Sequence, residues 1–336
     1  MKRLTVLVLV GIVLIVSSSI ILDRSQDQLA ILYQSRPIGQ GAVSPEPLQR
    51  PLSACGNGIV QPASGEQCDD GNTNNTDGCS NTCQATFGAK TVLTSSNAGE
   101  VSGAEWHDRS NSFWIVDDGG KMVQIASNGS ILGRWGNLGD IEGLAVADPA
   151  SDFVYVGREN PPSIFKWNTQ THLPNDLNTP GTFWPLTDLQ TCTGGNGGTD
   201  GLEALTFVEN DGTGDIFYAG SQCNGRVYKY RINQGTGTIQ NLGMIAGKPS
   251  NSNDLASLYF DPQYQVLYWV YDDINKLYAT RKNSSSILAS WNFDTGITPD
   301  QQESFSIRNG KAYLGTDNGT AGAGIFYEVP FAGLRY

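Results

Sequence analysis

The sequence is short of the residues on which several large classes of protein depend. Only two of its 336 residues are histidine, three are methionine, and charged residues make up 16%. No run of five or more basic residues occurs, and 33 acidic residues outnumber 21 basic ones, which gives a net charge of −12. Nucleic-acid binding needs Lys and Arg to displace counterions from phosphates, so this balance excludes a nucleic-acid partner. Cations and neutral surfaces are the better partners.

The usual parts of a nucleophilic hydrolase are also missing. No Gly-x-Ser-x-Gly elbow appears in the sequence. His107 and His172 are the only histidines that could act as bases, and we place them in a turn and in a loop. A Ser-His type of active site is therefore not predicted.

One long apolar run stands at the N-terminus. Residues 4–22 carry no charge, and Lys2 and Arg3 precede them. Both a cleaved signal peptide and a single-pass membrane anchor fit residues 1–22. Residues 23–54 are rich in Gln, Pro and Ser and predict a disordered linker. Either alternative puts the remainder outside the cell, secreted or on the surface, with membrane contact only if the segment is uncleaved.

Four of the six cysteines crowd into residues 55–84, a stretch poor in apolar residues. Such a module cannot offset its ordering entropy, about 1–2 kcal/mol per residue, without covalent or metal staples. Two disulfides would supply them, with three pairings open. A zinc site is less favoured, because the spacing lacks paired knuckles and an exported protein meets oxidising conditions. The four cysteines are Cys55, Cys68, Cys79 and Cys83.

The phrases Cys55-Gly-Asn-Gly, Gly65-Glu-Gln-Cys-Asp-Asp-Gly-Asn and Asp77-Gly-Cys-Ser-Asn-Thr-Cys-Gln resemble the myxococcal cysteine-rich repeat of bacterial surface proteins. Closely spaced oxygen donors between its glycines suit Ca²⁺, which takes six to eight oxygen ligands. A run of Asx turns uses the same residue types and is the alternative. The candidate donors are Asp69, Asp70, Asn72 and Asp77.

The rest of the chain, residues 88–336, predicts an all-β domain. Forty Gly, 13 Tyr and 7 Trp favour turn-rich β structure, and a loose repeat of short alternating strands recurs every 35–60 residues. The five repeat units begin at residues 101–106, 141–146, 202–207, 255–260 and 302–307. Radially arranged four-stranded blades, a β-propeller, are the economical interpretation.

The blade number follows from the two ends of the repeat. The last unit has three strands before the chain ends, and an unassigned strand at residues 90–94 precedes the first unit. A propeller closes by letting one terminus complete the other terminus's blade, which removes an exposed edge. Five blades closed in this way use every segment. Six blades, with the long second unit split, are the alternative.

Two phrases, Gly139-Asp-Ile-Glu-Gly-Leu-Ala and Ile115-Val-Asp-Asp-Gly-Gly, resemble the blade openings and turns of SdiA-regulated and esterase-like phytase propellers. The resemblance implies a propeller fold and, for activity, a Ca²⁺-dependent phosphoesterase or esterase. A phosphate would need cationic ligands. Arg158 and Glu159, adjacent in the sequence, are the candidate ligand-binding residues, and Arg158 is the one obvious cation.

In a propeller the starts of the first strands and the ends of the second strands surround one mouth of the central channel. Acidic residues gather at these positions, and a crowded ring of carboxylates must take up protons or bind a cation. All the donors are hard oxygens, so Ca²⁺ fits best. A solvated acidic rim is the alternative. The predicted metal ligands are Glu142, Glu203, Glu303, Asp117 and Asp273.

Cys192 and Cys223 fall on the same face of the third unit, so we predict a disulfide between them. We expect an exported propeller that binds a small-molecule, glycan or protein ligand at an acidic, Ca²⁺-loaded mouth. A phytase-like hydrolase is the competing class. A surface protein that adheres through its cysteine-rich module is a third hypothesis.

Overall fold

The computed structural model describes residues 55–95, 100–174, 182–193, 199–293, 301–317 and 324–335. The predicted signal or anchor (1–22) and linker (23–54) lie outside these residues. Within the described ranges, no helix is long and apolar enough to cross a membrane. The helix found there is a short 3-10 turn, η1 (Pro62–Ser64).

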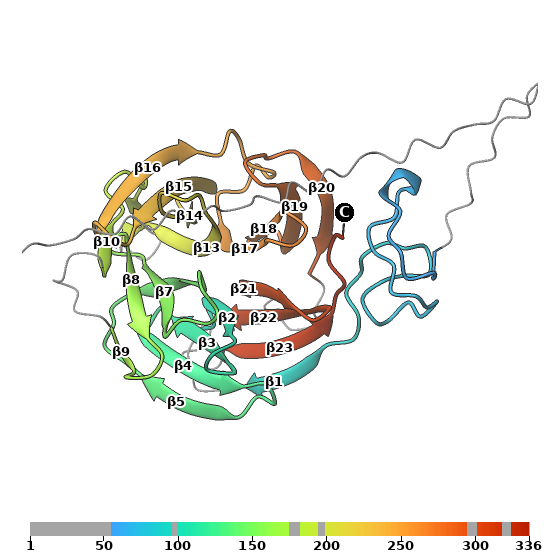
Figure 1. Cartoon of the computed structure of the whole chain (residues 1–336), viewed down its shortest axis with the longest axis horizontal. Coiled ribbons are helices and arrows are strands. Elements are labelled where there is room, and N and C mark those ends of the chain that lie inside the picture. The colour runs from blue at the N-terminus through green and yellow to red at the C-terminus, as the bar shows by residue number, and fades with distance from the viewer. Residues whose placement is uncertain are drawn as a thin grey trace, which may run out of the picture. The chain divides into compact units, whose positions relative to one another are not determined.

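Five antiparallel sheets stand around a common axis, which confirms the five-bladed, all-β propeller and not the six-bladed alternative (Figure 1). Blade 1 comprises β2 (Gly103–His107), β3 (Ser112–Asp117), β4 (Lys121–Ala126) and β5 (Ile131–Trp135); blade 2 comprises β6 (Ile141–Ala145), β7 (Phe153–Arg158), β8 (Ser163–Asn168) and β10 (Phe183–Pro185), with β9 (Leu173–Pro174) also on β8. Blade 3 comprises β13 (Leu202–Asn210), β14 (Asp215–Ser221), β15 (Arg226–Asn233) and β16 (Thr238–Met244); blade 4 comprises β17 (Leu255–Asp261), β18 (Val266–Tyr271), β19 (Lys276–Arg281) and β20 (Ile287–Asn292).

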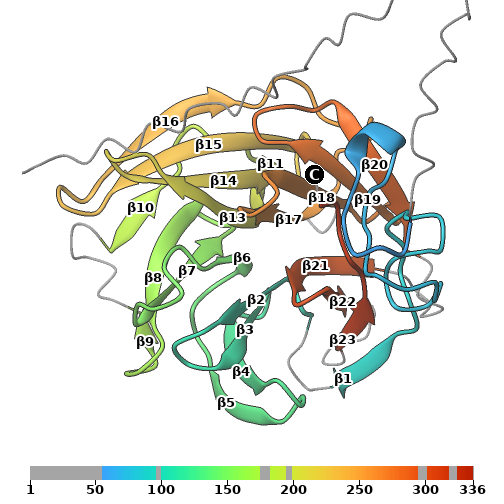
Figure 2. The same ribbon diagram turned by 45° about the vertical axis from the view of Figure 1, so that its right-hand side comes forward.

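Blade 5 is shared between the two ends of the propeller. Its inner strands are β21 (Gln301–Arg308), β22 (Lys311–Asp317) and β23 (Ile325–Pro330), and its outer strand is β1 (Thr91–Ser95). Thr91 of β1 pairs antiparallel with Glu328 of β23, and Figure 2 shows the two strands side by side. The predicted ring closure is therefore confirmed.

Glycine in the inner strands lets neighbouring blades approach closely. A Cβ on Gly143 of β6 would lie 2.6 Å from Cβ of Leu205 in β13. On the second strand of each blade, aromatic and β-branched residues are buried on both faces, as Trp114 and Trp269 illustrate with no exposed surface. The cores lie between successive blades, so each blade depends on its neighbours.

A disulfide joins Cys192 and Cys223, the pair named from the sequence, with their Cα atoms 5.7 Å apart. Cys192 belongs to a small ribbon formed by β11 (Cys192–Thr193) and β12 (Thr199–Asp200). This ribbon was not predicted. The sequence there offers only two-residue strands, too short to show a period.

In the cysteine-rich module the pairing left open by the sequence is nested, with disulfides Cys55–Cys83 and Cys68–Cys79. Together with the third disulfide they indicate an oxidising, extracellular compartment, as expected for a secreted or cell-surface protein.

The module packs against the propeller through the chain's C-terminal segment, residues 331–335, a contact that the sequence did not predict. The amide of Ala332 donates to the carbonyl of Gly78 (3.2 Å), and the amide of Arg335 donates to that of Gln67 (2.9 Å). On blade 4, Nε1 of Trp291 donates to the carbonyl of Ala85 (2.8 Å). Cysteines of the module thus share one apolar core with blades 4 and 5.

Candidate functional site

Carboxylates gather at one mouth of the propeller, where the inner strands begin and the second strands end. Burial, followed by the charges of these neighbours, raises the pKa values of the glutamates and of Asp254 and Asp272 around the ring. We call this set the acidic mouth. Its members are Glu100, Asp118, Asp140, Glu142, Glu159, Glu203, Asp254, Asp272, Glu303 and Asp317.

The tightest group within the mouth consists of Asp140, Glu142 and Glu159. One carboxylate oxygen from each lies within 4.8 Å of those of the other two. The amide of Glu159 donates to the carbonyl of Asp140 (3.0 Å), which holds the start of β6 beside the end of β7. Oε1 of Glu159 also accepts the amide of Gly201 (3.0 Å). Backbone pairing between neighbouring strands therefore fixes this carboxylate triad.

Burial is the main cause of the raised pKa values in the acidic mouth. Burial, followed by the hydrogen bond with Asp140 and then its charge, raises the pKa of Glu159 to about 8. Burial also raises the pKa of Glu142 well above its usual range, although Ser102 donates a hydrogen bond that opposes the rise. Just before β2, burial and Asp118 raise the pKa of Glu100 to about 9. These groups resist ionisation unless a cation compensates them.

Glu203 and Glu303 occupy the position equivalent to Glu142 in blades 3 and 5, as predicted, but they do not join the triad. Burial raises the pKa of both well above the usual range. Among the described residues, the triad is the only set of three acidic groups at the mouth whose oxygens all lie within 4.8 Å of one another; Glu100 makes a separate contact with Asp118 and Asp317. Of the three glutamates predicted to share an ion, Glu142 alone lies in it.

Asp117 and Asp273 have structural partners of their own. Asp117 is fully buried and accepts the amide of Lys121 (2.6 Å) as well as its Nζ (3.2 Å), which closes the β3–β4 turn. The exposed carboxylate of Asp273 accepts the hydroxyl of Ser252. Neither residue belongs to the triad, although the charge of Asp273, after burial, helps to raise the pKa values of Asp254 and Asp272 at the mouth.

Arg158 is directed toward the body of blade 2. Its Nε donates to Oγ of Ser163 (3.2 Å), and its guanidinium lies over the ring of Phe183, 5.3 Å from the centroid. A phosphate beside the triad would not be held by this side chain in the conformation seen.

The channel beneath the mouth is filled by side chains. The cavity that remains between Glu142, Glu203, Leu258 and Tyr259 measures about 10 Å³. That is room for roughly one water molecule. A ligand of the acidic mouth must therefore approach from outside the propeller.

In the cysteine-rich module, the carboxylate oxygens bind backbone amides. Asp69 accepts four of them, from Gly56, Asn57, Gly58 and Gly71, at 2.9–3.2 Å. Its pKa is lowered because these amides outweigh burial. Oδ1 of Asp70 accepts the amide of Asn72 (3.2 Å), and Nδ2 of Asn72 donates to Oδ2 of Asp77 (2.9 Å). These bonds match the Asx-turn alternative.

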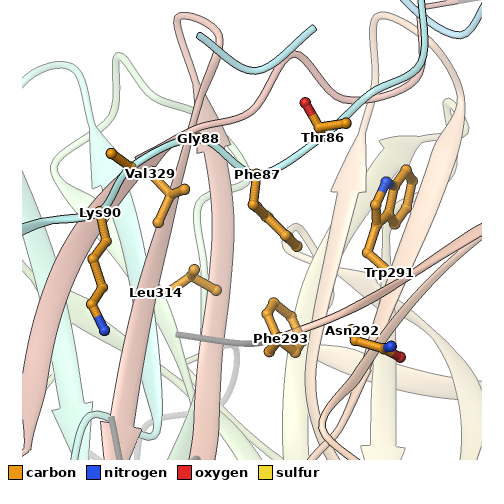
Figure 3. Close-up of a pocket in the computed structure, with 10 residues that line it drawn as sticks. Thr86, Phe87, Gly88, Lys90, Trp291, Asn292, Phe293, Leu314 and Val329 are labelled. Carbon is orange, nitrogen blue, oxygen red and sulfur yellow. The ribbon is translucent and has the colours of Figure 1, made fainter. Parts of the chain in front are cut away.

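A separate cavity of about 500 Å³ lies beside the segment that joins the module to the propeller (Figure 3). Trp291, Phe87 and Phe293 line it with Leu314 and Val329, and Phe87 stacks on Phe293 at 5.5 Å. No carboxylate lines it among the described residues. It is an apolar pocket and not the site that the acidic pattern predicts.

The raised pKa values predict the pH dependence of stability in the presence of chelator. A carboxyl whose pKa is higher in the folded than in the unfolded state binds protons on folding, so its stabilisation is present below the unfolded pKa and is lost as pH rises. Glu159 and Glu100, with folded pKa values of about 8 and 9, set the window. We expect the denaturation midpoint to fall steadily between about pH 5 and pH 9. A midpoint that rises with pH would contradict the crowded mouth.

Comparison with known proteins supports the fold and assigns no activity to this chain. Residues 51–84 match a domain of unknown function, DUF4215. The structure of Myxococcus xanthus glutaminyl cyclase is similar at 10% identity and a TM-score of 0.50, over 72% of this chain and 97% of that one. Weaker similarities are U3-55K (12% identity, TM-score 0.40, 69% of this chain and 62% of that one) and Kuenenia stuttgartiensis hydrazine synthase (13%, 0.39, 67% and 57%). The chain thus spans about three fifths of these two proteins.

No curated protein matches the sequence. At these identities the structural similarity supports a propeller fold alone, and none of it is specific to SdiA-regulated or phytase-type propellers. The conclusion is a five-bladed propeller preceded by a DUF4215 module.

Proposed function

We propose that this chain is an extracellular binding protein whose acidic mouth holds Ca²⁺ through Asp140, Glu142 and Glu159. The observation that carries the proposal is the mutual approach of their carboxylate oxygens, within 4.8 Å. Ca²⁺ binds oxygen at 2.3–2.6 Å, so ligands on opposite sides of one ion are about 5 Å apart. Three oxygens at this spacing fit a single ion.

The chemistry of the donors favours a hard cation. The triad contains neither histidine nor cysteine, and all its donors are carboxylates, which suit Ca²⁺ better than zinc or copper. Glu142 and Glu159 are only 6% and 9% exposed. Two buried carboxylates beside a third cannot all ionise without a compensating charge, and a divalent cation supplies it.

A ligand would complete the ion's coordination. Ca²⁺ takes six to eight oxygens, and three side chains supply only part of that set. Water or oxygen groups of a small-molecule, glycan or protein ligand would supply the rest. Because the channel below is filled, such a ligand would bind at the outer face of the mouth.

The two competing hypotheses receive less support. A phosphoesterase needs cations to hold its phosphate, and Arg158 lies over Phe183. Adhesion by the module alone is disfavoured because the module shares its core with blades 4 and 5. Turnover of a phosphate ester would restore the first hypothesis.

Calorimetric titration of Ca²⁺ into chelator-stripped protein tests the proposal. We expect binding with proton release, and tighter binding at pH 8 than at pH 6, because the carboxyls must lose protons to ligate the ion. At 100 times its Kd the ion should stabilise the fold by about 2.7 kcal/mol. Mg²⁺ at the same concentration serves as the control, since it demands stricter octahedral geometry. Absence of heat, proton release and stabilisation would overturn the proposal.

A further inference from the structure

A second polar pocket lies at the opposite end of the propeller from the acidic mouth. The inner strands β2, β17 and β21 begin at the mouth, and their last residues meet at this far end. The pocket measures about 280 Å³. We call it the lower pocket, and its polar and aromatic lining residues are Glu105, Trp106, Asp108, Tyr259, Ser306 and Arg308, with Asn309 at its edge.

Glu105 and Tyr259 line both the lower pocket and the small cavity under the acidic mouth, but that cavity has room for no more than about one water molecule. Leu144, Leu205, Leu258 and Phe305 fill the channel between the lower pocket and the acidic mouth, leaving the cavity of about 10 Å³ described above. A molecule in the lower pocket therefore cannot contact the triad. We therefore expect its binding to be independent of Ca²⁺.

A buried hydroxyl in the lower pocket has no partner. Ser306 is 4% exposed, and its Oγ is buried without a hydrogen bond among the described residues. The large majority of buried side-chain polar atoms have a partner in protein or water, so each exception calls for an explanation. A ligand that bonds this hydroxyl would provide one.

The surrounding side chains are held in place by the protein itself. The Arg308 guanidinium lies 3.8 Å from the centroid of the Trp106 ring, and Nε1 of Trp106 donates to Oδ1 of Asp108 (2.7 Å). The hydroxyl of Tyr259 donates to the carbonyl of Ile307 (2.9 Å). Oε2 of Glu105 accepts the amide of Val146 (2.8 Å). Groups fixed in this way lose little freedom when a ligand binds.

The charges in the lower pocket nearly cancel. Burial raises the pKa of Glu105 to about 8, so this carboxyl is mostly uncharged at pH 7. The carboxylate of Asp108 then balances the guanidinium of Arg308. An anionic ligand would be repelled by Asp108 and a cationic ligand by Arg308, so neither kind of ligand is favoured. The lining nevertheless offers donors, from Arg308 and Ser306, and an acceptor, from Asp108, which suits a neutral ligand with many hydroxyl groups.

We propose that the lower pocket binds a neutral, polyhydroxylated ligand the size of one sugar ring. Arg308, Asn309 and the carboxyl of Glu105 would bond its hydroxyls, and Ser306 would gain the partner it lacks. The volume lies just below the range of about 300–1,000 Å³ for ligand pockets, which favours a single ring over an oligosaccharide.

Ligand-observed NMR on the full-length protein tests the proposal, with the methyl glycosides of glucose, galactose and mannose as neutral probes. Glucuronate and glucosamine serve as the anionic and cationic counterparts. We expect at least one neutral glycoside to bind at millimolar concentration, and the charged probes to bind more weakly. Ser306→Ala should weaken that binding about tenfold, the equivalent of one hydrogen bond. Asn309→Gly, which keeps the left-handed backbone at φ 53°, should weaken it similarly.

Ser304→Ala is the matched control. Ser304 is also a buried, unpartnered serine of β21, but it does not line the lower pocket. The Ser304→Ala variant should leave sugar binding unchanged. Chelator should also leave it unchanged, so failure of the sugar-binding proposal is distinguishable from failure of the calcium proposal. No binding of any neutral glycoside would overturn the inference. So would preferential binding of glucuronate, or a loss with Ser304→Ala equal to that with Ser306→Ala.

Discussion

Asp140→Asn is expected to weaken Ca²⁺ binding by at least about 100-fold, the upper end of the loss measured for residues that only support a metal ligand. The change keeps the side chain's size and one oxygen but removes its charge. Asp140 lies between Glu142 and Glu159, and its charge raises the pKa of both after burial does. The metal-free variant should therefore be more stable than the metal-free wild type at pH 8. Calorimetry and denaturant unfolding in chelator measure the two effects.

Weaker Ca²⁺ binding together with higher stability of the metal-free protein distinguishes a metal ligand from a carboxylate that only supports the fold. Loss of a structural carboxylate would lower stability with or without Ca²⁺. Asp273→Asn is the matched control, because Asp273 is an exposed acid whose partner is Ser252. It should leave Ca²⁺ affinity nearly unchanged. Unaltered affinity in Asp140→Asn would exclude the triad as the calcium site.

Phe331→Ala is expected to lower the free energy of unfolding by about 3–5 kcal/mol, the usual cost of removing a buried phenyl ring. Phe331 has no exposed surface, and its ring lies 4.5 Å from that of Phe87 and 5.1 Å from that of Trp291. It stands where the C-terminal segment enters the core shared by the module and blades 4 and 5. The substitution should therefore also expose the module to proteolysis.

Denaturant unfolding followed by tryptophan fluorescence measures the loss. Leu132→Ala is the control, because Leu132 of β5 is 55% exposed and should change stability by no more than about 0.5 kcal/mol. A loss below about 1 kcal/mol for Phe331→Ala would mean that the ring is not part of a packed core. Intact protease resistance of the module would contradict its dependence on the C-terminal segment.

The two proposed sites differ in how visible they are in the sequence. The acidic mouth follows from a repeat, because Glu142, Glu203 and Glu303 stand at the same place in three units. Asp140 and Glu159 complete the triad only because β6 and β7 pair so that Ile141 faces Arg158. Glu100, which precedes the first unit, carries no periodic signal and was missed. The lower pocket draws on the ends of three strands, which no local pattern connects.

Local chemistry was enough to determine much of this protein. Alternating apolar residues fix the strands, a missing strand at one end and an extra one at the other fix five closed blades, and cysteine density fixes a stapled module. Only the tertiary structure decided which cysteines of the module pair, that the module joins the propeller core, and which carboxylates approach one another. These depend on distances between residues far apart in the chain. Such distances are set by packing between blades, and a one-dimensional pattern does not contain them.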